Sequence, residues 1–286
     1  MKQKEVAIVG SGASAMYAVL ACNAVGIKPD VFSKDLVVTP GAFWLKYLPR
    51  NVREFFKEEE IAILSIGSRE AYINKQWTSI PADYKSSFPS KNDKEVGYNP
   101  EIVLPYVFTL GDYCHLITLK ESLADDDLGY LSDNYKFVFH SFPTQKAKEV
   151  YRDKIVKNLS IISLHDKSLL TIRSLQNTAN WCMYDGDPTS VAVRQSALFG
   201  KFYIELSKYA SPENVEFIVN NYPNSKISFF FDLAPGDYSA GCFPVKERII
   251  PIGRPATFNR KELSSDTFSR VINILEGKDE HRTVVL

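Results

Sequence analysis

The hydrophobic pattern at the start of the chain predicts a strand, a helix and a second strand. Val6–Val9 is a continuous apolar, mostly β-branched run, typical of a strand buried on both faces of a parallel sheet. Residues 16–24 are rich in Ala, Leu, Met and Tyr, which predicts a helix, and Gly26 stands where such a helix ends. Residues 29–33 predict a second short strand, so the chain opens with a βαβ unit.

Farther along the chain, apolar runs separated by polar turns predict further elements. We expect strands at 60–66, 159–164, 227–231 and 248–252, a hairpin at 166–172, and helices at 147–156 and 267–275. Residues 77–100 are rich in Ser, Pro, Lys, Asn and Tyr and lack a period, which predicts a long loop. The alternation of strands and helices at the two ends of the chain predicts an α/β fold.

Small residues fill the turn between the first strand and the helix. Gly10 permits a tight turn, Gly12 leaves room for a pyrophosphate against the backbone, and Ala15 lets the helix pack closely on the strand. The helix N-terminus then offers N–H groups and a partial positive charge to phosphates. We therefore predict a dinucleotide-binding turn formed by Gly10, Ser11, Gly12, Ala13, Ser14 and Ala15.

The second strand departs from the usual dinucleotide pattern. An acidic residue commonly follows the glycines by about 20 residues and bonds the adenosine ribose. Ser33 occupies that place here and is followed by Lys34. Either Ser33 or the nearby Asp35 can bond a ribose hydroxyl, or Ser33 and Lys34 together can accept the 2′-phosphate of NADP. This end of the motif leaves FAD and NADP both open.

A strand, a Gly-Arg turn and a helix follow one another near the carboxyl terminus. The residues that form this turn and the segment behind it are Gly253, Arg254, Thr257 and Phe258. The arrangement resembles the flavin-binding segment of UDP-galactopyranose mutases and the wider amine-oxidase-like flavoproteins. That resemblance implies FAD as the cofactor, held by a Rossmann-type domain that both chain ends build. It covers the two ends of the chain and leaves residues 45–150 unmatched.

Two further segments carry the same resemblance. Tyr184 precedes a glycine turn, and Arg194 lies in a segment similar to the substrate-side segment of the mutases, so both are candidate substrate contacts. Val193 stands where that family usually has tyrosine, which argues against mutase chemistry. Gly41 and Ala42 follow the second strand, where related flavoproteins run beside the cofactor.

Composition and charge give no indication of a nucleic-acid, membrane or metal partner. The 286 residues carry 34 basic and 34 acidic side chains, so no net charge draws the chain toward nucleic acid or an anionic membrane. The apolar stretch after the glycines is too short and too polar to span a membrane, and the four cysteines are far apart without metal-ligand spacing. We expect a cytoplasmic protein with no metal site and a small-molecule substrate.

These observations predict an FAD-binding domain formed by residues 1–66, 146–175 and 226–286, with an inserted α+β substrate region formed by 67–145 and 176–225. The expected function is FAD-dependent oxidoreduction, with hydride transfer from a small or nucleotide-linked substrate to flavin N5. A mutase-like use of flavin on a sugar nucleotide and a dinucleotide-binding protein without turnover stay open. The compact chain also resembles flavoproteins encoded by bacteriophages, some of which act on modified bases in viral DNA. This resemblance keeps modified nucleic acid open as a partner.

Overall fold

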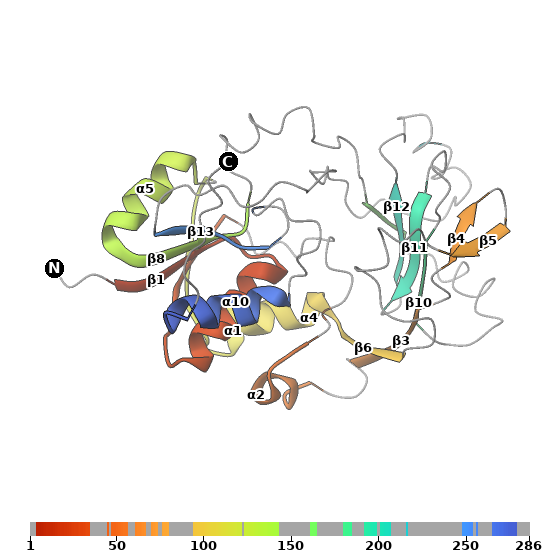
Figure 1. Ribbon diagram of the computed structural model, residues 1–286, viewed down its shortest axis with the longest axis horizontal. Helices are drawn as coiled ribbons and strands as arrows, with labels where there is room; N and C mark the ends of the chain where they lie inside the picture. The colour runs from red at the N-terminus through yellow and green to blue at the C-terminus, as the bar shows by residue number, and fades with distance from the viewer. Residues whose placement is uncertain are drawn as a thin grey trace. The chain divides into compact units, whose positions relative to one another are not determined.

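A computed structural model shows the chain as two compact units (Figure 1). One comprises Met1–Leu45, Pro100–Ile155 and Pro235–Leu286, and the other comprises Lys46–Asn99 and Val156–Ala234. We describe each unit by itself. The residues described are 4–34, 45, 47–56, 61–66, 70–73, 76–79, 94–121, 123–142, 161–164, 180–184, 192–198, 201–206, 216, 248–253, 256 and 265–278.

A five-stranded parallel sheet forms the centre of the first unit. Its strands, in the order β13-β8-β1-β2-β7, are Ile249–Pro251, Tyr135–His140, Lys4–Val9, Asp30–Ser33 and His115–Thr118. All four neighbouring pairs are parallel, so the five carboxyl ends share one edge. The chain leaves β1 toward β2 on one side, and β8 lies on the other side. The strand order therefore reverses at β1 and β8, which is where ligands bind in open α/β sheets.

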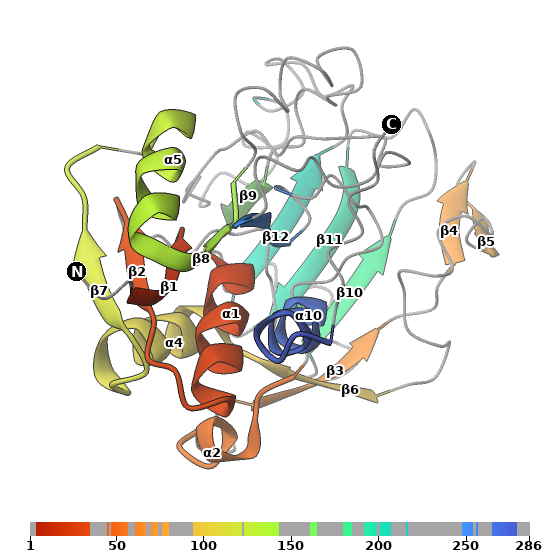
Figure 2. The ribbon, with the colours of Figure 1, turned by 60° about the vertical axis from the view of Figure 1, so that its left-hand side comes forward.

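Helices cover this sheet. They are α1 (Ala13–Ala24), α4 (Pro100–Pro105), the π-helix η2 (Tyr106–Leu110), α5 (Asp125–Asn134) and α10 (Asp266–Leu275). Every residue of α1 from Ala13 to Cys22 is buried, because the helix is apolar on all sides and lies between the sheet and α10 (Figure 2). Helices α1 and α10, from the two ends of the chain, thus pack against each other.

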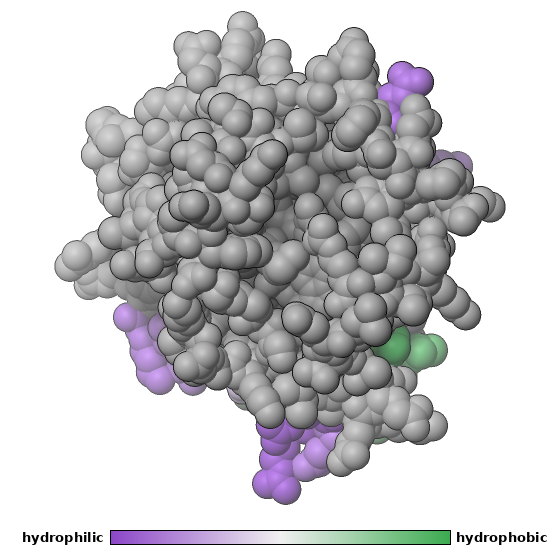
Figure 3. Space-filling model, turned by 90° about the vertical axis from the view of Figure 1, so that its right-hand side faces the viewer, coloured by the Kyte–Doolittle hydropathy of each residue, from purple (hydrophilic) through white to green (hydrophobic). Residues whose placement is uncertain are grey.

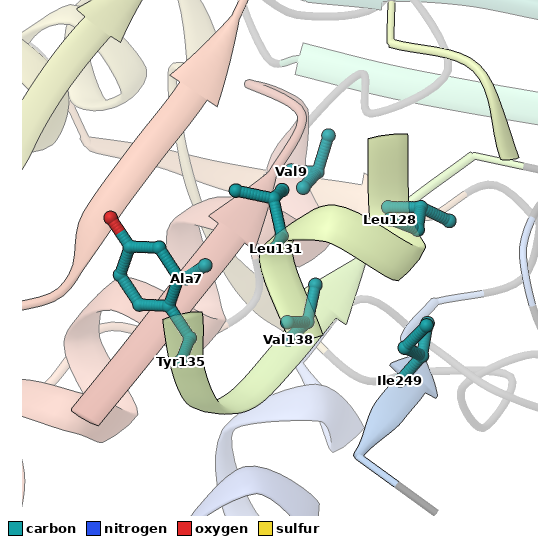
Figure 4. Packing of buried hydrophobic residues seen from close by; sticks show 7 residues of the cluster. All are labelled: Ala7, Val9, Leu128, Leu131, Tyr135, Val138 and Ile249. Atoms are coloured by element: carbon teal, nitrogen blue, oxygen red, sulfur yellow. The ribbon is translucent and has the colours of Figure 1, made fainter. Parts of the chain in front are cut away.

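The core on the α5 face joins three strands to that helix (Figure 4). Leu128 and Leu131 of α5 pack with Val9, Val138 and Ile249, which come from β1, β8 and β13. Alternate residues of a strand point to opposite faces, so Val6 and Ile8, also buried, lie on the α1 face. The continuous apolar run at the start of the chain is explained by this burial on both faces.

An ion-pair network lies at the opposite, amino-terminal edge of the sheet. The buried Asp30 accepts hydrogen bonds from Lys4 Nζ at 2.7 Å and from the Tyr135 hydroxyl at 2.5 Å. Burial by itself raises the pKa of Asp30, but the two hydrogen bonds outweigh it and the net pKa lies below its usual value. The network therefore favours an ionised carboxylate that ties together the starts of β1, β2 and β8.

We expect Asp30→Asn to lower the free energy of unfolding by about 1–2 kcal/mol near neutral pH, because hydrogen bonds to a charged acceptor are lost. A depressed folded pKa means that this stability is present above about pH 4 and is lost as the pH falls through the folded pKa. Urea unfolding at about pH 7 and about pH 3 measures both. A difference between wild type and variant that is equally large at both pH values would contradict the assignment.

The second unit contains a six-stranded mixed sheet in the order β6-β3-β10-β11-β12-β9. These strands are Lys94–Tyr98, Ile61–Ile66, Asn180–Tyr184, Ala192–Leu198, Lys201–Leu206 and Ile161–Leu164. The pair β3 and β10 is parallel and the other neighbours are antiparallel. The short helix α2 (Arg50–Arg53) and the hairpin of β4 (Glu70–Ile73) with β5 (Gln76–Ser79) also belong to this unit.

Most of the expected elements that lie among the described residues are confirmed. The βαβ unit, the strands at 60–66, 159–164 and 248–252, and the last helix are present with small shifts of their ends. The long loop expected at 77–100 is wrong at both ends, because β5 and β6 occupy them. The helix at 147–156, the hairpin at 166–172 and the strand at 227–231 lie outside the described residues.

The boundaries of the two units differ from the expected ones. We expect residues 67–145 in the substrate region, yet 100–145 belong to the first unit, because β7 and β8 are strands of its parallel sheet. Conversely, β3 belongs to the second unit, because it pairs with β6 and β10. Which unit binds which molecule stays a prediction.

Few large hydrophobic side chains are exposed in the described part of the chain. On the face drawn in Figure 3 the described residues are mostly hydrophilic, with one small hydrophobic spot. Large hydrophobic side chains that are exposed are scattered over several elements, and they are Tyr47, Phe55, Ile102, Leu110 and Tyr130. Single exposed apolar residues are normal on proteins. Among the helices of the described ranges, none has both the length and the apolar character to cross a bilayer.

Candidate nucleotide site

The turn from β1 into α1 lies at the carboxyl edge of the parallel sheet. Gly10 follows β1 directly and has a φ of 119°, a conformation that side-chain-bearing residues rarely adopt. Its N–H donates a hydrogen bond to the Phe32 carbonyl oxygen of β2 at 2.9 Å. The requirement for glycine at this first position of the turn is therefore conformational, as the sequence predicts.

The N-terminus of α1 opens onto the same edge. Gly12 is its N-cap residue in ordinary extended conformation, and no side chain caps the helix. The first helical hydrogen bond runs from the Met16 N–H to the Gly12 carbonyl oxygen at 3.0 Å, and the first turn carries no acidic residue. N–H groups of a first helical turn have no partner within the helix, so this end is suited to an anion such as a pyrophosphate.

The end of β8 lies against this turn. The Ser141 N–H donates to the Val9 carbonyl oxygen at 3.0 Å, and its Oγ lies 3.3 Å from the same oxygen. A Cβ placed on Gly10 would stand 2.1 Å from Ser141 Oγ. Gly10 thus also lacks a side chain because β8 comes close, a reason that the sequence does not reveal.

His140, the last residue of β8, is the most unusual polar group at this edge. It lies opposite Val9 of β1 and Pro251 of β13, and its residue surface is 1% exposed. Its Nδ1 donates to the Phe142 carbonyl oxygen at 2.9 Å, while Nε2 is buried with no hydrogen-bond partner among the described residues. Burial lowers the pKa of His140 to about 4, so the ring is neutral near pH 7.

The end of β2 supplies the two residues that we expect near the adenosine ribose. Ser33 is buried, and its carbonyl oxygen accepts a hydrogen bond from the Leu119 N–H at 2.9 Å. Lys34 is exposed immediately after it. Both lie on the β2 side of the turn, where the adenosine half of a dinucleotide lies in this fold. The choice between FAD and NADP stays a prediction here.

The end of β13 completes the edge. Gly253 is buried with a φ of 74°, and its carbonyl oxygen accepts a hydrogen bond from the Ala256 N–H at 3.0 Å. The Ile252 N–H donates to the His140 carbonyl oxygen at 2.9 Å, which fixes this turn beside β8. Thr267, near the start of α10, is buried and its Oγ1 has no hydrogen-bond partner among the described residues.

The first unit therefore brings the amino-terminal glycine turn and Gly253 to one edge of its sheet. That these residues contact a cofactor stays a prediction. Tyr184 and Arg194 belong to the second unit, where they are opposite each other in β10 and β11, and Glu205 of β12 is opposite Arg194. The residue paired with Arg194 on the neighbouring strand is thus acidic. Gly41, Ala42, Arg254, Thr257 and Phe258 lie outside the described residues.

Sequence reasoning missed His140 and Ser141, because it assigned residues 67–145 to the substrate region. A signal was present, since every second residue of 135–139 is aromatic and the two between them are Lys136 and Val138, a pattern typical of a strand. Within the described part of the chain no group of His, Cys, Asp and Glu could hold a metal ion. Cys22 and Cys114 are both free thiols.

Three solved structures illustrate the fold that this chain shares with known proteins. Glycine oxidase from Bacillus cereus matches with a TM-score of 0.52 and 10% identity over 99% of each chain. A geranylgeranyl bacteriochlorophyll reductase-like protein from Thermoplasma acidophilum matches with a TM-score of 0.54 and 10% identity over 96% of this chain and 77% of its own. Aklavinone-11 hydroxylase, solved with FAD and aklavinone, matches with a TM-score of 0.50 and 10% identity over 96% and 62%.

Identities this low establish the fold alone. The chain has the α/β, Rossmann-type fold of FAD-dependent flavoproteins. No family model matches the sequence, and no curated protein does. The resemblance to amine oxidases, UDP-galactopyranose mutases and phage flavoproteins stays a prediction.

Proposed function

We propose that this protein is an FAD-dependent oxidoreductase that accepts a hydride from a small or nucleotide-linked substrate. The observation that carries the proposal is the N-terminus of α1, which has no side-chain cap and no acidic residue in its first turn. It lies at the point where the strand order reverses, between the ends of β1 and β8. The shared fold supports FAD over NADP, since the similar structures include a hydroxylase in complex with FAD.

The residues at this edge fit such a cofactor. The backbone from Gly10 to Ala15 would hold the pyrophosphate, and Ser33 would bond the adenosine ribose. The Gly253 turn would lie by the other half of the molecule, because β13 is on the far side of β1 from β2. When bound, the flavin supplies the hydride acceptor, and the protein's part is to hold the substrate and exclude water. Arg194 and Tyr184 are the proposed substrate contacts.

The direct test is the visible absorption spectrum of the purified protein, with mass identification of the nucleotide released on denaturation. We expect the bands of oxidised flavin and the mass of FAD, together with anaerobic bleaching by a substrate. Release of NADP instead of FAD would show that the cofactor is NADP. Bound FAD that no substrate reduces would favour the mutase-like use or a protein without turnover. A colourless protein that takes up no FAD would overturn the proposal.

Gly12→Asp provides a matched variant. The observed backbone at Gly12 suits any residue, and aspartate is a good N-cap, so we expect the variant to fold. Its carboxylate would occupy the N–H groups and repel the phosphates, so we expect FAD to bind at least about tenfold more weakly. Gly12→Asn is the uncharged control, and fluorescence titration with FAD measures the three proteins. Equal affinity of wild type and Gly12→Asp would place the pyrophosphate elsewhere.

A further inference from the structure

We propose that two copies of this chain associate through β7, with the β7 strands of the two copies pairing antiparallel. The inference goes beyond the proposed function and does not depend on it. Strand β7 is the last in the order β13-β8-β1-β2-β7, and in the described part of the chain β2 is its only strand partner. Figure 2 shows β7 as the outermost strand on this side of the sheet.

The two edge strands of the sheet differ in exposure. All three residues of β13 are buried, and the strand ends in Pro251. In β7 the first and last residues, His115 and Thr118, are exposed, and the two between them are half-buried. Proline, lysine and β-bulges commonly protect an exposed edge from other strands, and β7 contains none of them. The β7 edge is therefore open to a further strand.

The hydrogen bonds of β7 show which of its backbone groups face outward. The N–H groups of His115 and Leu119 both donate to carbonyl oxygens on the β2 side at 2.9 Å. Successive residues of a strand direct their backbone groups to opposite sides, so the N–H and C=O groups of Leu116 and Thr118 point away from β2. These four groups form a ladder that an additional strand can extend.

The charges that flank β7 favour a second copy as that strand. Among the antiparallel twofold registers that use the outward groups, one places Leu116 opposite itself. This register brings Lys120 of each copy toward Asp112 of the partner subunit. Both side chains are exposed, and Asp112 is 88% exposed although it pairs with Lys28. Unlike charges therefore meet at both ends of the paired strands, which makes the edge complementary to itself.

An exposed leucine extends this surface beyond the strand. Leu110, the last residue of η2, is 75% exposed, and η2 packs beside β7. Its burial against a second copy would contribute up to about 2 kcal/mol for each subunit. The strand is short, however, and stable interfaces bury about 1,600 Å² in total. We therefore expect a weak dimer that dissociates at micromolar concentrations.

Thr118→Pro tests the backbone ladder. Proline removes the outward N–H group, and it is tolerated on an edge strand where that group does not bond a neighbouring strand. Thr118→Ala is the matched control, because it shortens the side chain and keeps the N–H group. Sedimentation velocity over about 1–100 μM measures the dimer, and melting temperatures check the fold. We expect Thr118→Pro to dimerise at least about tenfold more weakly than wild type and Thr118→Ala to dimerise nearly as well.

Lys120→Glu tests the register without touching the ladder. It places like charges together at both ends, so we expect about tenfold weaker dimerisation at low salt and little change at high salt. Neighbouring registers place Lys120 opposite an uncharged residue and predict no such loss. This variant also decides the question if Thr118→Pro does not fold.

Three results would overturn the inference. They are a wild-type protein that stays monomeric over the whole range, a folded Thr118→Pro that dimerises as well as Thr118→Ala, and a Lys120→Glu that dimerises as well as wild type at low salt. Each of them leaves the proposed function intact, because cofactor binding is measured separately on the same proteins.

Discussion

Replacement of Gly10 by alanine is expected to lower the free energy of unfolding by about 3 kcal/mol. A φ of 119° is strained for any residue with a Cβ, at a cost of about 1–3 kcal/mol. The added Cβ also stands 2.1 Å from Ser141 Oγ, so that hydroxyl has to rotate away from the Val9 carbonyl oxygen. The lost hydrogen bond adds about 1 kcal/mol. Urea denaturation of the purified variant measures the sum.

Gly26→Ala is the matched control for this change. Gly26 also has a positive φ, 78°, but no atom lies within 4 Å of the Cβ that alanine would add. We therefore expect it to cost only about 1 kcal/mol, from strain alone. Ser141→Ala alone should cost about 1 kcal/mol, but added to Gly10→Ala it should cost almost nothing further, because the hydrogen bond to Val9 is already lost there. Equal costs for the two glycine variants, with a double variant that costs the sum of Gly10→Ala and Ser141→Ala, would show that β8 does not restrict Gly10.

The same two strands show which parts of the fold the sequence predicts. Val6–Val9, the glycine turn and the helix behind it are neighbours along the chain, so local periodicity and the turn residues suffice to define the βαβ unit. The pairing of β1 with β8 joins residues that are more than a hundred positions apart. No local pattern records which distant strand supplies that partner, and the unit boundaries were consequently misplaced.

The residues of the candidate site also divide into those that local sequence reveals and those that only the tertiary fold reveals. Gly10, Ser33 and Gly253 are found from turn chemistry and spacing, and the structure places them at strand ends on one edge. His140 has no such signal, because its importance arises from burial and from one hydrogen bond, both of which depend on packing. A histidine in a sequence gives no indication of which nitrogen is occupied. The polar group most dependent on the tertiary fold is thus the one that sequence reasoning missed.

Acidification between about pH 6.5 and pH 4 is expected to remove about 3 kcal/mol of stability through His140 alone. Burial holds the folded pKa of this ring at about 4, while an unfolded histidine titrates near 6.5. Since the folded pKa is the lower one, the unfolded state binds the extra proton as the pH falls. The stability is therefore fully present above about pH 6.5 and is lost progressively down to about pH 4, a shift of about 1.4 kcal/mol per unit.

His140→Asn isolates this effect, because asparagine does not titrate and keeps a donor for the Phe142 carbonyl oxygen. Unfolding free energies measured in urea at several pH values should fall steeply for wild type over this range and much less for the variant. The ion pair of Asp30 does not interfere, since the lowered pKa of that carboxyl places its own loss below about pH 4. Parallel curves for the two proteins would mean that the protonated ring finds a partner in the folded state.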